Sequence, residues 1–172
     1  PPRCTYSLSI LGPESLSVGG GLVMQRKDFE VVNRKGIVLK CSQWKPSFVD
    51  DASSLPCVLY LHGNSSARID VIRTRSLVSL STMGCTVVSF DFSGSGLSGG
   101  EYVTLGGNEQ HDVADVISFM RREKLATKFT IWGRSMGAAS ALLYVRNYGT
   151  DFVTGLVLDS AFASFKELCL DL

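Results

Sequence analysis

The chain has 172 residues, of which 45% are hydrophobic and 19% are charged, and its formal net charge is +1. This length suits one domain with an apolar core, and the near-neutral charge gives no electrostatic reason to expect a nucleic-acid partner. No apolar run approaches the roughly 20 residues of a membrane span and no signal peptide is recognised, so we expect a cytoplasmic protein without a membrane span.

Residues that bind metals or form disulfides are sparse. The five cysteines are odd in number and widely spaced, without a CxxC pair, so we interpret them as reduced thiols, with Cys57 and Cys85 as small core residues beside strands. The two histidines, His62 and His111, lie far apart in the chain and without clustered carboxylates. The sequence therefore predicts neither a metal site nor a cofactor.

The N-terminal part of the chain is expected to be irregular. Residues 1–26 contain Gly, Ser and Pro without a clear period, and we interpret them as a lead-in to a domain that covers 27–172. Apolar residues in 27–32 and in 37–44 flank the turn Asn33-Arg34-Lys35-Gly36, which predicts an antiparallel hairpin. Residues 46–56 are polar and are expected to form a loop.

From residue 57 onward, predicted strands and helices alternate, which is typical of a parallel sheet with helices on both faces. The 108–124 segment has the clearest helical period, and the apolar strands suit burial on both faces. The sequence thus predicts an α/β fold with a mostly parallel sheet and an N-terminal antiparallel hairpin. Strands are expected at 57–61, 86–92, 129–132 and 155–158, and helices at 68–82, 108–124, after residue 135, and at 164–172.

The segment Gly133-Arg134-Ser135-Met136-Gly137 lies between a predicted strand and a helix rich in Ala. This is the context of a nucleophile elbow, in which a serine occupies a strained turn and small flanking residues avoid the adjacent elements. A glycine-rich turn without a catalytic role is the alternative. We interpret Ser135 as a nucleophile at the carboxyl end of the sheet, beside a helix N-terminus.

The residues His62-Gly63-Asn64 follow the predicted strand 57–61. In folds with such an elbow, the turn after this strand supplies a backbone N–H to the oxyanion hole, together with the N–H of the residue after the serine. Asn64 and Met136 are therefore the predicted main-chain donors. His62 precedes the nucleophile, so we expect it to pack or hydrogen-bond in this loop rather than act as the base. His111 is expected at the surface.

A second glycine pattern suggests an alternative class of protein. Gly94, Gly96 and Gly99 match G-x-G-x-x-G after a predicted strand, as in dinucleotide-binding folds. That motif requires the glycines to open a helix directly, so that the helix N-terminus holds the pyrophosphate. Here, the residues up to Gly107 separate them from the predicted helix. We therefore expect a flexible loop at 94–100 and no bound nucleotide.

Five stretches together resemble the α/β-hydrolase superfamily, in its serine-aminopeptidase-like esterase/lipase group found in plants and protists. The elbow and the loop Asp91-Phe92-Ser93-Gly94-Ser95-Gly96 are specific for the superfamily, though not for a substrate. The resemblance implies the α/β-hydrolase fold and a serine hydrolase with a Ser-Asp/Glu-His triad. The stretches occur in the family's order at 27–31, 59–65, 89–100, 132–138 and 156–160.

The resemblance also implies residues that are absent from these 172. In the family the acid follows a later strand and the histidine lies near the C-terminal end, whereas this chain has no histidine after Ser135. We therefore expect a truncated domain whose last strands, acid and histidine lie beyond residue 172. Asp159, after the strand 155–158, is an alternative acid, although a structural role such as helix capping is expected for it.

Two functions remain open. The first is hydrolysis of a carboxylic ester or thioester bond in a small-molecule or acyl ester substrate, with Ser135 as the nucleophile. The second is a non-catalytic hydrolase-fold subunit that serves in an assembly, where a protein partner covers the open sheet edge and its apolar face.

Overall fold

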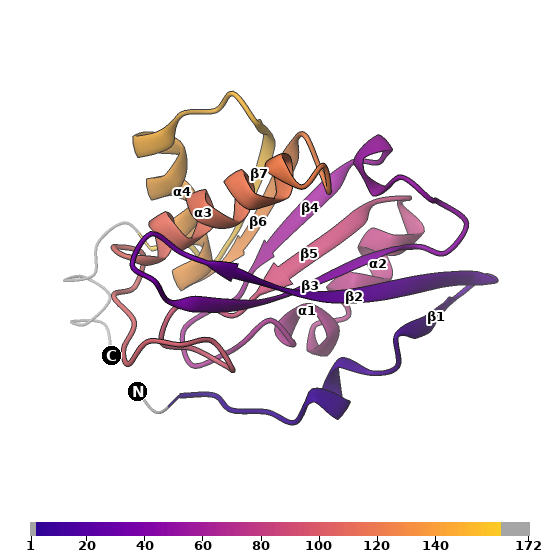
Figure 1. Ribbon diagram of the computed structural model, residues 1–172, viewed down its shortest axis with the longest axis horizontal. Coiled ribbons are helices and arrows are strands. Elements are labelled where there is room, and N and C mark those ends of the chain that lie inside the picture. Colours follow the sequence, from indigo (N-terminus) through magenta and orange to yellow (C-terminus); the bar gives the residue numbers. More distant parts are fainter. Residues whose placement is uncertain (1–2, 163–172) are drawn as a thin grey trace.

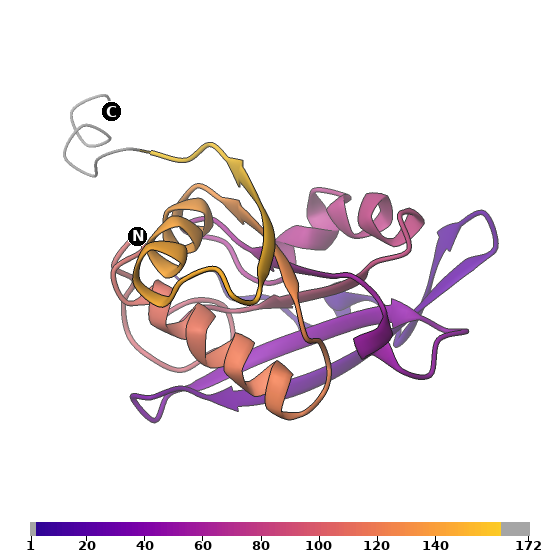
Figure 2. The same ribbon diagram turned by 90° about the horizontal axis from the view of Figure 1, so that it is seen from above.

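The computed structural model describes residues 3–162, and a mixed sheet forms its centre (Figures 1 and 2). The described strands lie in the order β1-β2-β3-β5-β4-β6-β7. Neighbours from β1 to β5 are antiparallel and those from β5 to β7 are parallel, which confirms the predicted α/β arrangement. The strands are β1 (Ser15–Gly19), β2 (Leu22–Val32), β3 (Val38–Pro46), β4 (Cys57–Leu61), β5 (Thr86–Phe90), β6 (Phe129–Arg134) and β7 (Val153–Asp159).

Helices cover both faces of the sheet (Figure 1). Leu59 and Tyr60 are successive residues of β4, so their side chains point to opposite faces, and they belong to two different core clusters. α3 and α4 contribute to the cluster around Leu59, whereas α1 and α2 contribute to the cluster around Tyr60. The helices are α1 (Asp70–Arg73), α2 (Ser76–Thr82), α3 (Glu109–Arg122) and α4 (Met136–Tyr148), with short 3-10 turns at Leu8–Leu11 and Ala52–Ser54.

The N-terminal part is more regular than expected. The expectation of an irregular lead-in over 1–26 is wrong for residues 15–19 and 22–26, which form β1 and the first part of β2. Serines alternate with Leu16 and Val18 in β1, and the half-buried apolar residues face the second core cluster. The glycine run 19–21 has positive φ at each residue, so it makes the tight turn of a hairpin rather than a flexible linker.

The predicted helix 68–82 is two helices instead of one. Arg75 has φ of 59°, in the left-handed region, and separates α1 from α2. The hydroxyl of Thr74 donates to the carbonyl of Asp70 and lies 2.8 Å from the hydroxyl of Ser76. Such local side-chain bonds offer the backbone an alternative to a continuous helix. Hydrophobic periodicity alone does not detect this break.

The other predicted elements from residue 57 onward are confirmed within one to three residues at their ends, which is the usual uncertainty of a boundary. All residues of β4 and β5 are buried, as expected for central strands covered on both faces. Cys57 and Cys85 are free and buried. The helix expected at 164–172 lies outside the described residues. None of the helices within residues 3–162 is long and apolar enough to cross a membrane.

Candidate active site

Ser135 occupies a strained turn between β6 and α4. Its φ of 48° and ψ of −112° are values that residues other than glycine rarely adopt. Both of its main-chain groups are held: its N–H donates to the carbonyl of Asp159 over 2.8 Å, and its carbonyl accepts from Ala139 over 3.0 Å. The surrounding elements therefore maintain a conformation that costs about 1–3 kcal/mol on its own.

The glycines that flank Ser135 have no room for a side chain. A Cβ on Gly137 would lie 2.2 Å from the carbonyl oxygen of Leu61 in β4, and a Cβ on Gly133 would lie 2.4 Å from the carbonyl oxygen of Gly137. Neither Gly133 nor Gly137 has a positive φ, so their backbone conformations do not require glycine. The close approach of neighbouring backbones is the reason why both positions are glycine. The spacing Gly-x-Ser-x-Gly thus follows from the packing of β6, α4 and β4.

The loop after β4, which contains Asn64, lies against Ser135. A Cβ on Gly63 would lie 3.7 Å from the Cβ of Ser135, which places the loop after β4 directly against the serine. Asn64 follows Gly63 and is exposed. Met136 is the first residue of α4, so its N–H has no acceptor within the helix. The roles of Asn64 and Met136 as donors stay predictions.

His62 is completely buried and both of its ring nitrogens are engaged. Nε2 accepts from the N–H of Phe92 over 3.2 Å, and Nδ1 lies 2.8 Å from the carbonyl oxygen of Gly63. Because Nε2 accepts, Nδ1 carries the proton and donates to Gly63. Desolvation lowers the pKa of His62, so the ring is neutral. The expected hydrogen bonding of His62 within this loop is confirmed, and its lack of a role as the base stays a prediction.

Asp159 contacts Ser135 through its main chain. Its carboxylate is about half exposed, accepts from the hydroxyl of Ser160 over 2.8 Å, and lies 3.7 Å from Nε of Arg134. Arg134, the residue between Gly133 and Ser135, also reaches the carboxylate of Asp70 over 3.4 Å. These contacts connect the elbow to α1 and to the end of β7, and they favour a structural role for Asp159.

Asp91 is a buried residue just after β5 that the sequence indicated only as part of a motif. Its carboxylate accepts from the main chains of Arg68 and Leu97, over 2.6 and 2.9 Å, and from the hydroxyl of Tyr6 over 2.8 Å. A Cβ on Gly96 would lie 2.3 Å from this carboxyl group, so glycine lets the loop close around it. An acidic residue at a strand end before a glycine-rich loop is the local sequence signal for a buried carboxylate of this kind. That Tyr6 is its partner is visible only in the fold.

The dinucleotide alternative lacks its required geometry. Gly94 to Gly99 form a tight loop in which the N–H of Gly94 donates to the carbonyl of Gly99 over 2.8 Å. The next helix, α3, begins only at Glu109, so the glycines do not open a helix that points at a pyrophosphate. Gly96 instead lets the loop close around Asp91, whereas Gly94 allows the close approach of the Tyr102 backbone.

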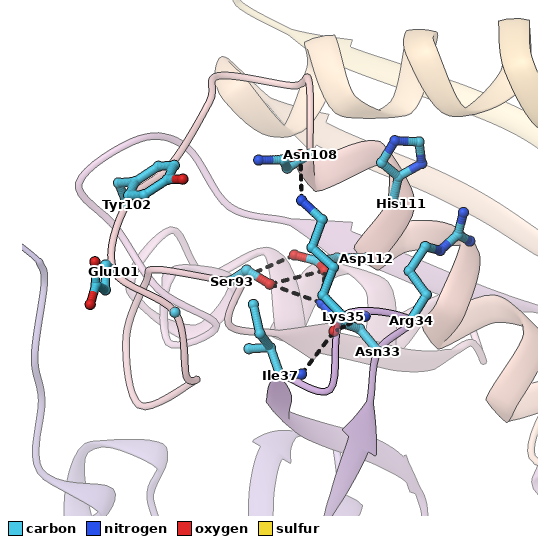
Figure 3. Close-up of a pocket in the computed structure, with 11 residues that line it drawn as sticks. Asn33, Arg34, Lys35, Ile37, Ser93, Glu101, Tyr102, Asn108, His111 and Asp112 are labelled. Atoms are coloured by element: carbon cyan, nitrogen blue, oxygen red, sulfur yellow. Dashed lines mark hydrogen bonds between the residues drawn. The ribbon is translucent and has the colours of Figure 1, made fainter.

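A cavity of about 150 Å³ lies beside this loop, between the β2–β3 turn and the start of α3 (Figure 3). Its polar side chains bond mainly to one another: Asp112 accepts from Asn33 and Ser93, and Lys35 donates to Asn108. His111, expected at the surface, is half-buried here and contacts the hydroxyl of Tyr148. Ser135, Gly63 and Met136 are not among the lining residues. The hydrogen bonds around this cavity therefore hold the loop in place, and Ser135 is not part of the cavity wall.

Comparison with protein families and curated proteins identifies relatives. The family model described as serine aminopeptidase, S33, matches residues 57–169. The lysophosphatidylserine lipase ABHD12 of Xenopus tropicalis is 32% identical over 118 residues, which cover 67% of this chain and 30% of that protein. The protein YqkD of Bacillus subtilis is 33% identical over 86 residues, 49% of this chain and 28% of its own length. The chain thus spans under a third of these relatives.

Solved structures share the fold. The esterase Pf2001 of Pyrococcus furiosus superposes with a TM-score of 0.72 and 24% identity, over 94% of this chain and 57% of the esterase. The esterase EaEST of Exiguobacterium antarcticum superposes with a TM-score of 0.64 and 22% identity, over 80% of this chain and 46% of the esterase. Both resemble the described sheet and helices, and at this identity they inform the fold alone.

Proposed function

Because the chain belongs to the serine aminopeptidase S33 family, within the α/β-hydrolase superfamily, we propose that it is a serine hydrolase of carboxylic ester or thioester bonds. Ser135 is the nucleophile. The observation that carries the proposal is the strained backbone of Ser135, which is held between β6 and α4 with Gly63 against it. Strain of this kind persists where the surrounding structure maintains it, and it is concentrated at active sites.

The proposed reaction uses Ser135 and the two predicted main-chain donors. Oγ of Ser135 attacks the carbonyl carbon, and the main-chain N–H groups of Asn64 and Met136 donate hydrogen bonds to the carbonyl oxygen, on which negative charge develops. The N-terminus of α4 adds a favourable partial positive charge. The alcohol or thiol leaves as the acyl-enzyme forms, and water then releases the acid.

Ser135 requires a base that neither histidine of the chain provides. Both nitrogens of His62 are engaged, and Nδ1 of His111 contacts the hydroxyl of Tyr148. Without a base the hydroxyl remains a weak nucleophile near neutral pH. We assign the base, and the acid that orients it, to residues that follow position 172 in the natural protein or come from another chain.

A fluorophosphonate probe tests this function directly, because it reacts with activated serines. The full protein is expected to be labelled, and Ser135→Ala is expected to abolish the labelling. Ser118→Ala is the matched control, because Ser118 is exposed on α3 and should leave the labelling unchanged. If the folded wild-type protein is not labelled and hydrolyses no ester, the proposal is wrong.

The sheet edge favours the second candidate function, an interaction or structural subunit. Within residues 3–162, β7 pairs only with β6, and Val157 and Leu158 are exposed. A strand edge with exposed apolar side chains is a surface that favours pairing with further chain. A full protein that resists the probe yet forms a stable hetero-oligomer would favour this function. A labelled monomer in size-exclusion chromatography with light scattering would rule it out.

A further inference from the structure

The loop after β4, which carries a predicted oxyanion donor, is held at two points by successive residues that follow β5. At its start, Nε2 of His62 accepts from the N–H of Phe92 over 3.2 Å. At its end, the N–H of Arg68 donates to Oδ1 of Asp91 over 2.6 Å. His62 and Arg68 are buried, whereas Asn64 between them is exposed. The position of the Asn64 main chain therefore depends on how firmly both points are held.

Tyr6 completes the second of these two points. Its hydroxyl donates to Oδ2 of Asp91 over 2.8 Å and accepts from Nε of Arg68 over 2.7 Å. This Nε and Oδ2 are 3.9 Å apart, beyond hydrogen-bond distance, and both side chains are at most 3% exposed. The hydroxyl of Tyr6 thus bridges a buried ion pair. Burial, together with the negative charge of Asp91, raises the pKa of Tyr6, so the hydroxyl keeps the proton that it donates.

The carboxylate of Asp91 connects this bridge to a second loop. Its Oδ2 also accepts from the N–H of Leu97 over 2.9 Å, and the carbonyl of Asp91 accepts from the hydroxyl of Ser98 over 2.6 Å. The loop after β4, the loop after β5 and the N-terminal segment therefore meet at one buried carboxylate. Hydrogen bonds to an ionised group are stronger than those between neutral groups, so this junction holds both loops.

The N-terminal segment keeps Tyr6 in place. Its ring packs against the second core cluster, and its centroid lies 5.9 Å from Cζ of Arg68. Leu11, at the end of the following 3-10 turn, is fully buried in the same cluster. On the other side of Tyr6, Nη1 of Arg3 donates to a carbonyl of the loop after β5 over 3.0 Å. This segment precedes the residues 57–169 that the family model matches, so the family motifs do not include the contact.

We propose that Tyr6 is a positioning residue for the oxyanion loop, residues 62–68, and that the N-terminal segment thereby contributes to catalysis. The inference rests on the proposed hydrolase function. Without the hydroxyl, Arg68 and Asp91 close the gap between them. Because the N–H of Arg68 is bonded to the same carboxylate, this movement shifts the loop that lies against Ser135. A misplacement of about 1 Å costs as much as about 100-fold in rate.

Steady-state kinetics on an ester substrate tests the proposal in the full protein. Tyr6→Phe, which removes the hydroxyl and keeps the ring, is expected to lower kcat about tenfold and to leave KM within about twofold, because oxyanion stabilisation acts in the transition state. The Ki of a trifluoromethyl ketone, whose adduct with the serine carries the oxyanion, should rise by the same factor. A merely structural role would lower the stability without separating kcat from KM.

Arg68→Lys tests the same bridge from its other side, since it keeps the charge and lacks Nε. The same selective loss of kcat is expected, and this variant carries the test if Tyr6→Phe does not fold. In the double variant the two losses should not multiply, because both substitutions remove one shared contact. Losses that multiply fully would mean that the two residues act independently, against the proposal.

Tyr148→Phe is the matched control. Its hydroxyl accepts from Nη1 of Arg34 over 2.6 Å, much as that of Tyr6 accepts from Arg68, but it lies at the opposite end of α4 from Ser135. It should change neither kcat nor KM.

Two kinds of failure are distinguishable. If the wild type hydrolyses the ester, an unchanged kcat or a rise in KM alone in a folded Tyr6→Phe or Arg68→Lys variant would overturn the positioning role, as would an equal loss in Tyr148→Phe, and the hydrolase function would stand. A wild-type protein that hydrolyses no ester and resists the fluorophosphonate probe would instead contradict the proposed function and this inference together.

Discussion

Nδ1 of His62 lies 2.8 Å from the carbonyl oxygen of Gly63, and this carbonyl belongs to the same peptide plane as the N–H of Asn64. In a trans peptide the two groups point in opposite directions, so the buried imidazole determines where the Asn64 N–H points. Phe92 in turn donates to Nε2 and keeps the proton on Nδ1. A residue of the next loop therefore sets the direction of a predicted oxyanion donor.

His62→Phe is expected to lower kcat by about 100-fold with KM within about threefold, because loss of one oxyanion donor typically costs 10²–10³ in kcat. His62→Asn, whose amide is able to donate to Gly63, should recover part of the loss. Steady-state kinetics on an ester substrate measures kcat and KM for both variants. His111→Asn serves as the control and should retain the wild-type rate. A change in KM alone would mean that His62 only maintains the shape of the pocket.

The free energy of unfolding should depend on pH through His62. Desolvation lowers its pKa in the folded protein below the ordinary value of 6.5. Above pH 6.5 the ring is neutral in both the folded and the unfolded protein, so the contribution of His62 to the free energy of unfolding is fully present. Below pH 6.5 the unfolded chain binds the proton first, so stability falls by up to ~1.4 kcal/mol per pH unit until the folded pKa is reached. Urea unfolding between pH 7.5 and 5.5 should show this extra dependence of the unfolding free energy on pH in the wild type and not in His62→Asn. The same dependence on pH in both proteins would contradict the prediction.

Gly137→Ala should destabilise the fold strongly, because its Cβ would lie 2.2 Å from the carbonyl oxygen of Leu61. We expect a loss of about 3 kcal/mol in the free energy of unfolding, the size typical of severe overpacking, and loss of fluorophosphonate labelling. Gly155→Ala is the matched control, since its Cβ would make an ordinary contact of 3.6 Å with Thr130. Urea denaturation compares the two. Similar losses for both variants would show that the close approach to β4 is not the cause.

Asp159→Asn should keep kcat/KM within about threefold of the wild type. The carboxylate is half exposed, and its partners are Arg134 and Ser160 rather than a histidine. Ester hydrolysis measures the effect, and the Ser135→Ala variant gives the background rate of the assay. A drop of 10³–10⁴-fold, as expected for loss of a triad member, would instead make Asp159 the catalytic acid.

Much of the fold was predictable because its signals are local. The buried strands β4 and β5 are continuous apolar runs, and α3 shows a helical period over its whole length. The hairpin β1–β2 was not predicted, because a glycine run suits both a linker and a tight turn, and only pairing with a neighbouring strand distinguishes them.

By itself, the sequence determined the elbow and the loop after β4. Gly133, Ser135 and Gly137 lie within five residues, so a local motif identifies them, although the close approach to Leu61 in β4 is what requires Gly137. Only the tertiary structure decided which distant residues hold the loops after β4 and β5. Tyr6 meets Asp91 across 85 positions, and Phe92 sets the tautomer of His62 across 30. Such contacts depend on which segments the sheet order brings together, and no local pattern of residue types encodes that order.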